Sequence, residues 1–181
     1  GMDAALRRAV SRGVVVVVAA GNSNMAYGNT DTTFFSPGGY GREIEGVITV
    51  GSYDTATGAR SSFSNYGSTY VEIAAPGAES SAASRGIFST GPMGRYQRVQ
   101  GTSMSTGLVA GAAALVMSTL KASGETPTPA QIEQILMGAA VHRSNLTNFC
   151  KDGNVMDLGV LAQFLQTRNL VDLEGGTREG F

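Results

Sequence analysis

The sequence has little cysteine, little net charge and no long apolar run, and each of these shortages excludes a class of protein. Cys150 is the only cysteine among 181 residues, so no internal disulfide can form and the compartment cannot be deduced from cysteine pairing. Thirteen lysines and arginines against fourteen aspartates and glutamates leave a net charge of -1 without a basic stripe, which argues against nucleic acid or an anionic membrane as partner. No unbroken apolar segment reaches the roughly 18 residues that a membrane-spanning helix needs.

The length suits one domain with one hydrophobic core, because domains usually contain about 100 to 200 residues. The chain shows neither an internal repeat nor a low-complexity linker, and no basic-apolar signal segment follows Gly1 and Met2. We therefore expect a single domain over residues 1–170. Residues 171–181, which end in EGGTREGF, lack a core pattern and are expected to form a mobile tail.

Several apolar runs predict strands. VVVVVAAGN, residues 14–22, is typical of a strand buried on both faces, as in a parallel sheet under helices. VITVGSY covers residues 47–53 and predicts a second strand, and YVEIAAPG predicts a third that ends at Pro76 and Gly77. GIFST and RYQRVQG flank GPMG like the two arms of a hairpin.

Four segments show helical patterns. Residues 2–13 predict a short helix, and residues 103–120 are long and apolar enough to predict a buried helix. Thr-Pro-Ala-Gln at residues 128–131 supplies a capping threonine, a first-turn proline and a capping-box glutamine for a third helix. A fourth is expected over residues 157–168, with Asp157 as its starting residue. Together, strands and helices predict an α/β fold of three layers, with a mainly parallel sheet between helices.

Ser103, in the stretch RVQGTSMSTGLVAG, opens the predicted buried helix. A serine hydroxyl acts as a nucleophile only when a base takes its proton and a donor stabilises the resulting oxyanion. Helix-end amides and the positive end of the helix dipole favour negative charge beside Ser103. Asn22 follows the carboxyl end of a predicted strand, where an α/β sheet presents ligand-binding groups. Taken alone, Ser103 would also fit the role of a helix-capping residue, and Asn22 would also fit the role of a turn residue.

Five motifs together resemble the subtilisin-like serine protease family, peptidase S8. GTSMS followed by VAGAAALV, VVVVVAAGN, VITVGS, SSFSNYG and IAAPG all match, in the family's order, over roughly residues 3–165. The resemblance implies the carboxyl-terminal part of a subtilisin-like catalytic domain. It also implies a serine endopeptidase in which Ser103 is the nucleophile and an acyl-enzyme is the intermediate.

The resemblance assigns further roles around Ser103. Asn22 matches the residue whose side-chain amide donates to the oxyanion, and SPGG, residues 36–39, resembles a wall of the substrate pocket. The pocket for the substrate residue before the cut would be lined partly by Ala19, Ala20, Gly21 and Ser23. Their small side chains leave room for a large substrate residue.

The sequence departs from the family's pattern in two ways. The family's aspartate and histidine precede the serine, whereas His142 follows Ser103 and is expected to be an ordinary helix-end residue. In α/β-hydrolases the catalytic residues follow the order serine, aspartate, histidine, and the serine stands in a G-x-S-x-G elbow. This chain reads GTSMS around Ser103, so the elbow is absent. Where the family usually continues with a small residue, proline and histidine, this chain has Thr106, Gly107 and Leu108.

These departures leave a second hypothesis open, a non-catalytic fragment or pseudoprotease scaffold used for binding or assembly. The expected partners are a peptide or protein substrate and either the missing amino-terminal half of the domain or a second copy, paired through the uncharged strand at residues 14–20. The sequence itself shows no cofactor site and no location; the resemblance allows for a bound calcium ion and suggests an extracellular or cell-envelope location. Cys150 is expected to be an apolar filler or an exposed thiol, and Asn145-Leu146-Thr147 fits a glycosylation acceptor.

Overall fold

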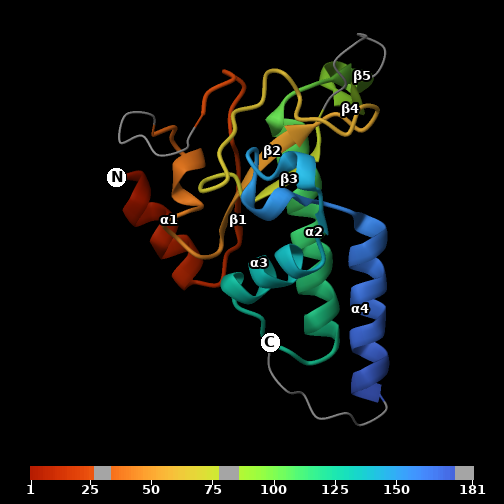
Figure 1. Cartoon of the computed structure of the whole chain (residues 1–181). Coiled ribbons are helices and arrows are strands. Elements are labelled where there is room, and N and C mark those ends of the chain that lie inside the picture. Colours follow the sequence, from red (N-terminus) through yellow and green to blue (C-terminus); the bar gives the residue numbers. More distant parts are fainter. Residues whose placement is uncertain (27–33, 78–85, 174–181) are drawn as a thin grey trace.

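The computed structural model describes residues 1–26, 34–77 and 86–173, with side chains up to residue 168. These residues form a five-stranded sheet flanked by helices and a separate two-stranded hairpin (Figure 1). The strands are β1 (Val16–Ala19), β2 (Val47–Tyr53), β3 (Ile73–Pro76), β4 (Ile87–Gly91), β5 (Arg95–Val99), β6 (Val141–His142) and β7 (Asn154–Val155). The α-helices are α1 (Met2–Ser11), α2 (Thr102–Ala122), α3 (Pro129–Gly138) and α4 (Leu158–Leu173). Short 3-10 helices are η1 (Gly38–Tyr40), η2 (Pro92–Gly94), η3 (Ser144–Leu146) and η4 (Lys151–Gly153).

The strand order across the sheet is β1-β2-β3-β7-β6. β1, β2, β3 and β7 are parallel, and β6 runs antiparallel to β7. Because parallel strands bring their carboxyl ends to one edge, the ends of β1, β2 and β3 lie together. This topology confirms the predicted α/β fold with a mainly parallel sheet. The two short strands β6 and β7 were not predicted.

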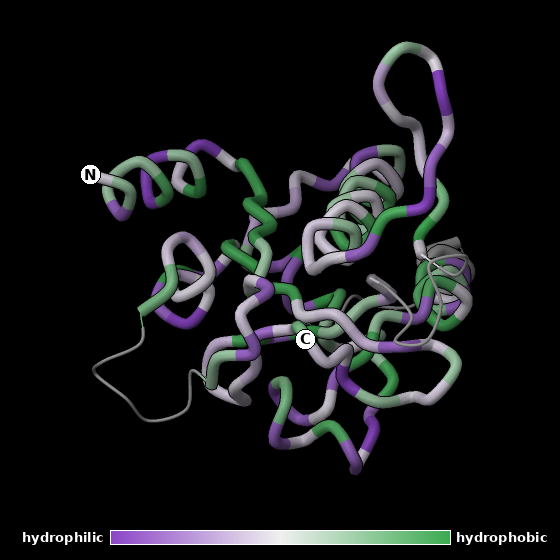
Figure 2. Tube along the Cα trace, turned by 90° about the horizontal axis from the view of Figure 1, so that it is seen from above, coloured by the Kyte–Doolittle hydropathy of each residue, from purple (hydrophilic) through white to green (hydrophobic). Residues whose placement is uncertain are grey.

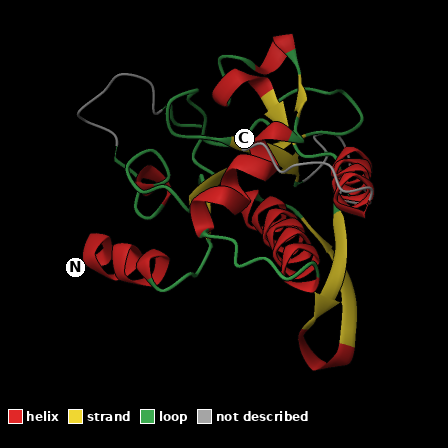
Figure 3. Cartoon of the chain, turned by 90° about the horizontal axis from the view of Figure 1, so that it is seen from below, coloured by secondary structure: helices red, strands yellow, loops and turns green. Residues whose placement is uncertain are grey.

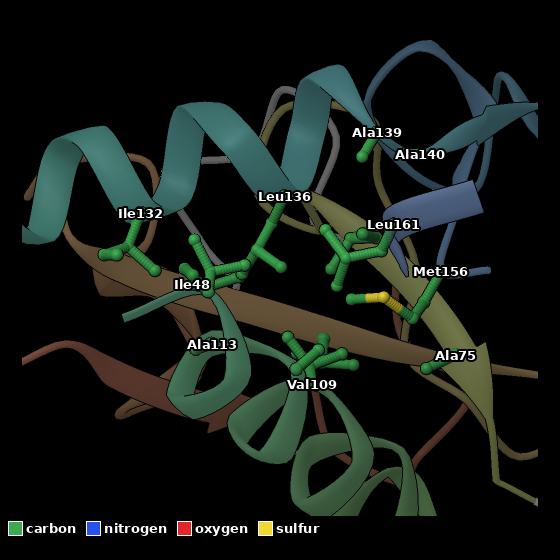
Figure 4. Close-up of a cluster of buried hydrophobic side chains, with 14 of the residues drawn as sticks. Ile48, Ala75, Val109, Ala113, Ile132, Leu136, Ala139, Ala140, Met156 and Leu161 are labelled. Atoms are coloured by element: carbon green, nitrogen blue, oxygen red, sulfur yellow. The ribbon is translucent and has the colours of Figure 1, made fainter. Parts of the chain in front are cut away.

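One face of the sheet is covered by α2, α3 and α4. Side chains of β2 and β3 pack against these helices in the largest core cluster, and Figure 4 shows α3 and α2 meeting around Ile48. Fully burying a valine, leucine or isoleucine side chain stabilises a fold by about 1.5–3 kcal/mol. The sheet members of the cluster are Ile48, Val50, Ile73 and Ala75. This packing fixes α2, and hence its first turn, against the sheet.

The opposite face is covered by α1 and by short helical turns. Leu6 of α1 packs with Val18, Ile44 and Val47, while Leu146 and Phe149 near η3 lie in a cluster with other residues of this face. Helices and turns therefore lie on both sides of the sheet, and the predicted three layers are confirmed.

Two segments are less buried than the sequence predicts. β1 is an edge strand in the described sheet, and Val18 alone among its four residues is buried, so the prediction of a fully covered strand is wrong for β1. All residues of β2 are buried, because β2 pairs with a strand on each side and lies inside the sheet.

α2 is buried along one stripe rather than all round. Its buried residues are Thr102, Ser105, Val109, Ala112, Ala113, Val116 and Leu120. Leu115, on another side, is 43% exposed, so the prediction of a wholly buried helix is wrong. By length and composition α2 would also be apolar enough to cross a membrane, but here its buried stripe packs against β1, β2 and β3.

The predicted caps of the last two helices are confirmed. The Gln131 N–H donates to Thr128 Oγ1 at 3.2 Å, and the Thr128 N–H donates to Gln131 Oε1 at 2.8 Å. At the start of α4, Asp157 Oδ1 accepts the Gly159 N–H at 2.8 Å and the Val160 N–H at 3.0 Å. α4 then continues to Leu173, so residues 171–173 are helical rather than part of a tail. Residues 174–181 lie outside the described residues.

A pair of glutamates lies at the amino ends of β2 and β3. Glu72 is 5% exposed, and its Oε2 accepts the Thr49 N–H at 3.2 Å. Glu133 of α3 hydrogen-bonds to Glu72 and accepts the Gly46 N–H. Burial, followed by the charge of Glu133, raises the pKa of Glu72 to about 9. Glu72 therefore keeps its proton at neutral pH.

Candidate active site

The loop after β1 and the first turn of α2 meet at the carboxyl edge of the sheet, where β1 and the start of α2 lie in Figure 1. The Gly21 N–H donates to Thr102 Oγ1 at 3.2 Å, which joins residues 81 positions apart in the chain. The packing of α2 on the sheet and this hydrogen bond together hold the two segments side by side.

The Asn22 side chain is anchored through its oxygen. Asn22 Oδ1 accepts the Thr102 N–H at 3.0 Å and the Thr102 Oγ1–H at 2.9 Å. A side-chain amide has one oxygen and one NH₂ group, so fixing the oxygen also fixes the direction of Nδ2. Nδ2 is thereby held as a donor beside the first turn of α2.

Gly101 shapes the space between Asn22 and Ser103. Its φ of 147° is one that side chains rarely adopt, so the position favours glycine. A Cβ on Gly101 would lie 3.4 Å from Asn22 Nδ2 and 3.8 Å from the Ser103 backbone nitrogen. Two nitrogen donors therefore flank one small space, an arrangement that suits an oxygen carrying negative charge.

Ser103 is the second residue of α2 and is exposed. Within the described part of the chain its backbone N–H has no hydrogen-bond partner, as is usual in the first turn of a helix. The helix dipole adds positive potential at this end. Among the described residues, neither a histidine nor a carboxylate hydrogen-bonds to the Ser103 hydroxyl.

A buried asparagine to which the sequence analysis gave no role shapes the loop that carries Asn22. Asn65 Nδ2 donates to Ala20 O at 2.8 Å, and Asn65 Oδ1 accepts the N–H groups of Ser23 and Met25, both at 2.9 Å. Gly21 has a φ of 104°, and a Cβ there would collide with Asn65 Nδ2. The signal in the sequence was the motif SSFSNYG, which carried the resemblance without a role for its asparagine.

The four predicted pocket residues lie on this strand end and loop. Ala20 is fully buried in the core, its N–H donates to Val50 O and its carbonyl accepts from Asn65 Nδ2, so its side chain does not reach the surface. Ser23 is exposed, and Ala19 is half-buried. The SPGG segment packs beside them, because a Cβ on Gly38 would lie 3.0 Å from Ala19 O.

Two hydrogen bonds join the start of α2 to the end of β3 and the residue that follows it. Ser105 Oγ donates to Ala75 O at 2.9 Å, and the Gly101 N–H donates to Gly77 O at 3.0 Å. A Cβ on Gly77 would collide with the hydroxyl groups of Ser105 and Ser52. Gly77, the glycine of the IAAPG motif, is therefore required because no side chain fits at this position. The absence of a side chain lets the start of α2 approach the end of β3.

The three residues that depart from the family's pattern lie in the second turn of α2. Thr106 Oγ1 donates to Thr102 O at 2.7 Å, and Leu108 is half-buried. Gly107 is exposed, and a Cβ there would meet no atom within 4 Å. The described surroundings therefore do not require glycine at this position.

Other residues considered from the sequence lie away from Ser103. His142 is on β6, at the sheet edge opposite to β1, and its Nδ1 lies 3.4 Å from Asp152 O. It is thus a strand residue, and the expectation of a helix-end residue is wrong. Cys150 is buried, and burial raises the pKa of its thiol to about 12, so it is a core filler rather than an exposed thiol. Asn145 is exposed on η3 and donates to Gly58 O at 3.1 Å.

Comparison with known proteins agrees with this architecture. The model of the Subtilase family matches residues 1–164. Alkaline serine exoprotease A of Vibrio alginolyticus is 40% identical over 139 residues, which are 77% of this chain and 22% of that protein. Subtilisin DY of Bacillus licheniformis is 40% identical over 122 residues, 66% of this chain and 39% of that protein. A solved structure of proteases from Pseudoalteromonas arctica is 33% identical with a TM-score of 0.70, over 90% of this chain and 46% of that chain.

The chain therefore spans less than half the length of each of these three proteins. Within that span, the parallel sheet, the long helix that begins inside the Gly-Thr-Ser sequence and the loop after β1 occur together. With the family match over residues 1–164, they lead to one conclusion. This chain belongs to the subtilase family of serine peptidases, peptidase S8.

Proposed function

We propose that this chain carries the nucleophile and the oxyanion-stabilising half of a subtilisin-like serine endopeptidase site. Ser103 Oγ attacks the carbonyl carbon of a peptide bond, the amine half leaves, and water then hydrolyses the ester of the acyl-enzyme. Asn22 Nδ2 and the Ser103 N–H donate to the oxyanion in both steps. The observation that supports the proposal is the pair of hydrogen bonds from Thr102 to Asn22 Oδ1, because they fix the direction of the Asn22 amide, whose Nδ2 lies beside Gly101.

The proton of Ser103 needs a base. We propose that the family's aspartate and histidine come from a segment outside residues 1–181, either in the same polypeptide or in a separate chain. The histidine takes the proton from Ser103 and gives it to the leaving amine. His142 has no part in this step, since it lies at the opposite edge of the sheet.

The substrate residue before the cut would bind against the strand end and loop that contain Ala19, Ala20, Gly21 and Ser23. An extracellular location is proposed from the resemblance, and one relative, from Thermus, is named an extracellular serine proteinase. A calcium ion is also proposed. No group of three or more His, Cys, Asp or Glu side chains gathers in the described ranges, so a calcium ion held there would rely on backbone carbonyl groups.

A second candidate is a pseudoprotease scaffold. It is favoured by one observation, the Thr106-Gly107-Leu108 sequence directly after the nucleophile motif, where the family usually has a small residue, proline and histidine. A scaffold would keep the fold and the loop contacts without turnover.

The test compares variants of a longer protein, in which residues 1–181 are joined to the proposed segment that carries the aspartate and histidine, by hydrolysis of an activated peptide ester. Ser103→Ala should abolish turnover. Asn22→Asp keeps the acceptor for Thr102 and removes the donor, so kcat should fall by at least about 10²–10³-fold, the size known for this donor in subtilisin itself. The temperature of unfolding should not change, which separates loss of the donor from loss of the loop.

The isolated chain should show no Ser103-dependent hydrolysis, because it lacks a base at the site. A longer protein that is folded yet inactive would support the scaffold instead. Full activity of Asn22→Asp would contradict the proposed oxyanion site.

A further inference from the structure

The β4–β5 hairpin, here called the arm (residues 86–99), projects from the rest of the molecule. Its register pairs Ile87 with Val99, Phe88 with Arg98 and Thr90 with Tyr96. From Phe88 to Arg98 every residue except Gly91 is exposed. Figures 2 and 3 both show the two strands extending beyond the helices and the main sheet. The arm is therefore a two-stranded ribbon with both faces in solvent.

One face of the arm carries an ordered row of planar groups, here called the platform (Phe88, Tyr96 and Arg98). The rings of Phe88 and Tyr96 stack with centroids 5.4 Å apart and an angle of 16° between their planes. The Arg98 guanidinium lies 5.5 Å from the centre of the Phe88 ring. Alternation along a strand puts these three side chains on the same face.

The platform is exposed although it is largely apolar. Phe88 is 61% exposed and Tyr96 is 67% exposed, whereas aromatic side chains usually lose most of their contact with water. Stacking holds both rings and the guanidinium in place before any ligand arrives. A ligand that covers the platform would therefore bury apolar surface at a small additional loss of side-chain entropy.

The charged side chains of the arm are all positive. Residues 86–101 contain Arg95 and Arg98 and no aspartate or glutamate, in a chain whose net charge is -1. Arg98 uses one of its N–H groups to reach Gly86 O at 3.0 Å. An arginine has five N–H donors, so most of its hydrogen-bonding capacity is left for a carboxylate.

The place of the arm in the chain links it to Ser103. β5 ends at Val99, four residues before Ser103, and only Gln100 and Gly101 separate β5 from α2. A polypeptide segment held on the arm would therefore be tethered close to the nucleophile, which raises its effective concentration there.

We propose that the arm is a docking surface for acidic, aromatic-containing segments of a polypeptide substrate. The substrate's aromatic ring stacks on the platform, and its carboxylates pair with Arg95 and Arg98. This inference rests on the proposed peptidase function for the identity of the partner as a substrate. A single-stranded nucleic acid is the less suitable occupant, because such binding relies on a groove lined with many cations and the arm offers two.

The test measures the fluorescence anisotropy of labelled six-residue peptides titrated with the full chain. One peptide has four glutamates, a phenylalanine and a tyrosine; a second replaces the glutamates by lysines, and a third replaces the aromatic residues by alanines. The first should bind about tenfold more tightly than either of the others, a difference of about 1.4 kcal/mol, and should weaken with salt. Hexathymidylate serves as the nucleic-acid probe and should bind more weakly than the first peptide.

Variants of the chain locate the binding. The double variant Arg95→Glu, Arg98→Glu and the double variant Phe88→Ser, Tyr96→Ser should each weaken binding of the first peptide about tenfold. The control Arg8→Glu, Lys121→Glu changes the net charge equally on exposed positions of α1 and α2, and should leave binding unchanged.

Equal binding of the three peptides, insensitivity to the arm variants, or tighter binding of hexathymidylate would each overturn the proposal. The assay requires no turnover, so it is independent of the peptidase proposal. Failure of the arm leaves Ser103-dependent hydrolysis intact in the longer protein, whereas failure of hydrolysis leaves peptide binding to the arm intact.

Discussion

Replacing Glu72 by glutamine should remove much of the pH dependence of this domain's stability. Glu72 lies between the Thr49 N–H of β2 and the carboxyl group of Glu133 on α3, and Lys151 is a nearby opposite charge. Glutamine can accept from Thr49 with its oxygen and donate to Glu133 with its NH₂ group. It therefore mimics the protonated carboxyl group of Glu72 but stays neutral at every pH.

The sign and size follow from the raised pKa of Glu72, about 9 against 4.5 for an ordinary glutamate. Between these values the folded state keeps a proton that the unfolded chain has lost. The contribution of Glu72 to stability is thus complete below about pH 4.5 and is lost as the pH rises toward 9. The loss is at most about 1.4 kcal/mol per pH unit, or about 2–4 kcal/mol between pH 5 and pH 8. This is a large share of the 5–15 kcal/mol typical of a domain.

The assay is urea unfolding followed by circular dichroism at several values between pH 5 and pH 8. Glu72→Gln should match the original chain within about 1 kcal/mol at pH 5 and exceed it by about 2–4 kcal/mol at pH 8. Glu133→Gln should also reduce the slope, because it removes the neighbouring charge. Glu43→Gln removes an exposed carboxylate and should follow the original chain at each pH. The reasoning is refuted if the original chain is equally stable at both ends of this range, or if Glu72→Gln runs parallel to it.

Three further predictions concern other parts of the molecule. Asn65→Ala removes the hydrogen bonds to Ala20, Ser23 and Met25 and should lower the free energy of unfolding by about 2–4 kcal/mol; an unchanged urea midpoint would contradict the role of Asn65. Cys150 should react with a thiol reagent such as DTNB only after unfolding, because its thiol is buried and its pKa is raised to about 12; fast reaction of the folded chain would show that the core is open there. The isolated chain should self-associate through the edge strand β1, and Val16→Lys should reduce the light scattering of micromolar solutions; a clean monomer whose solubility does not respond to Val16→Lys would contradict this.

The fold class and most elements could be predicted from the sequence, because short-range physics decides them. The β-branched run at residues 47–53 coincides with β2, and the Thr-Pro-Ala-Gln sequence at residues 128–131 forms the expected capping box. In both places the deciding interactions lie within a few residues, in the pattern of side chains and in the hydrogen bonds of one helix turn. The five ordered motifs also sufficed to identify the family, since their sequence order reflects one topology.

The errors arose where burial depends on the rest of the molecule. A valine run predicts a strand, but its neighbours in the sheet decide how much of it is covered, and β1 stands at the edge. Similarly, the apolar composition of α2 is uniform around the helix, so it does not reveal which stripe faces the sheet. The end of α4 was missed because residues 169–173 have no strong stop or start signal of their own.

The sequence by itself determined the α/β architecture, the helix caps and the candidacy of Ser103 and Asn22. The tertiary structure alone decided which end of the Asn22 amide is held, that Asn65 ties down the loop after β1, and that burial beside Glu133 raises the pKa of Glu72. The hydrogen bonds of Asn65 and Asn22 join residues 40 to 80 positions apart, so they depend on the packing of α2 and the register of the sheet. No local pattern encodes them, because the hydrogen-bond partner of a buried polar group is chosen by the fold that surrounds it.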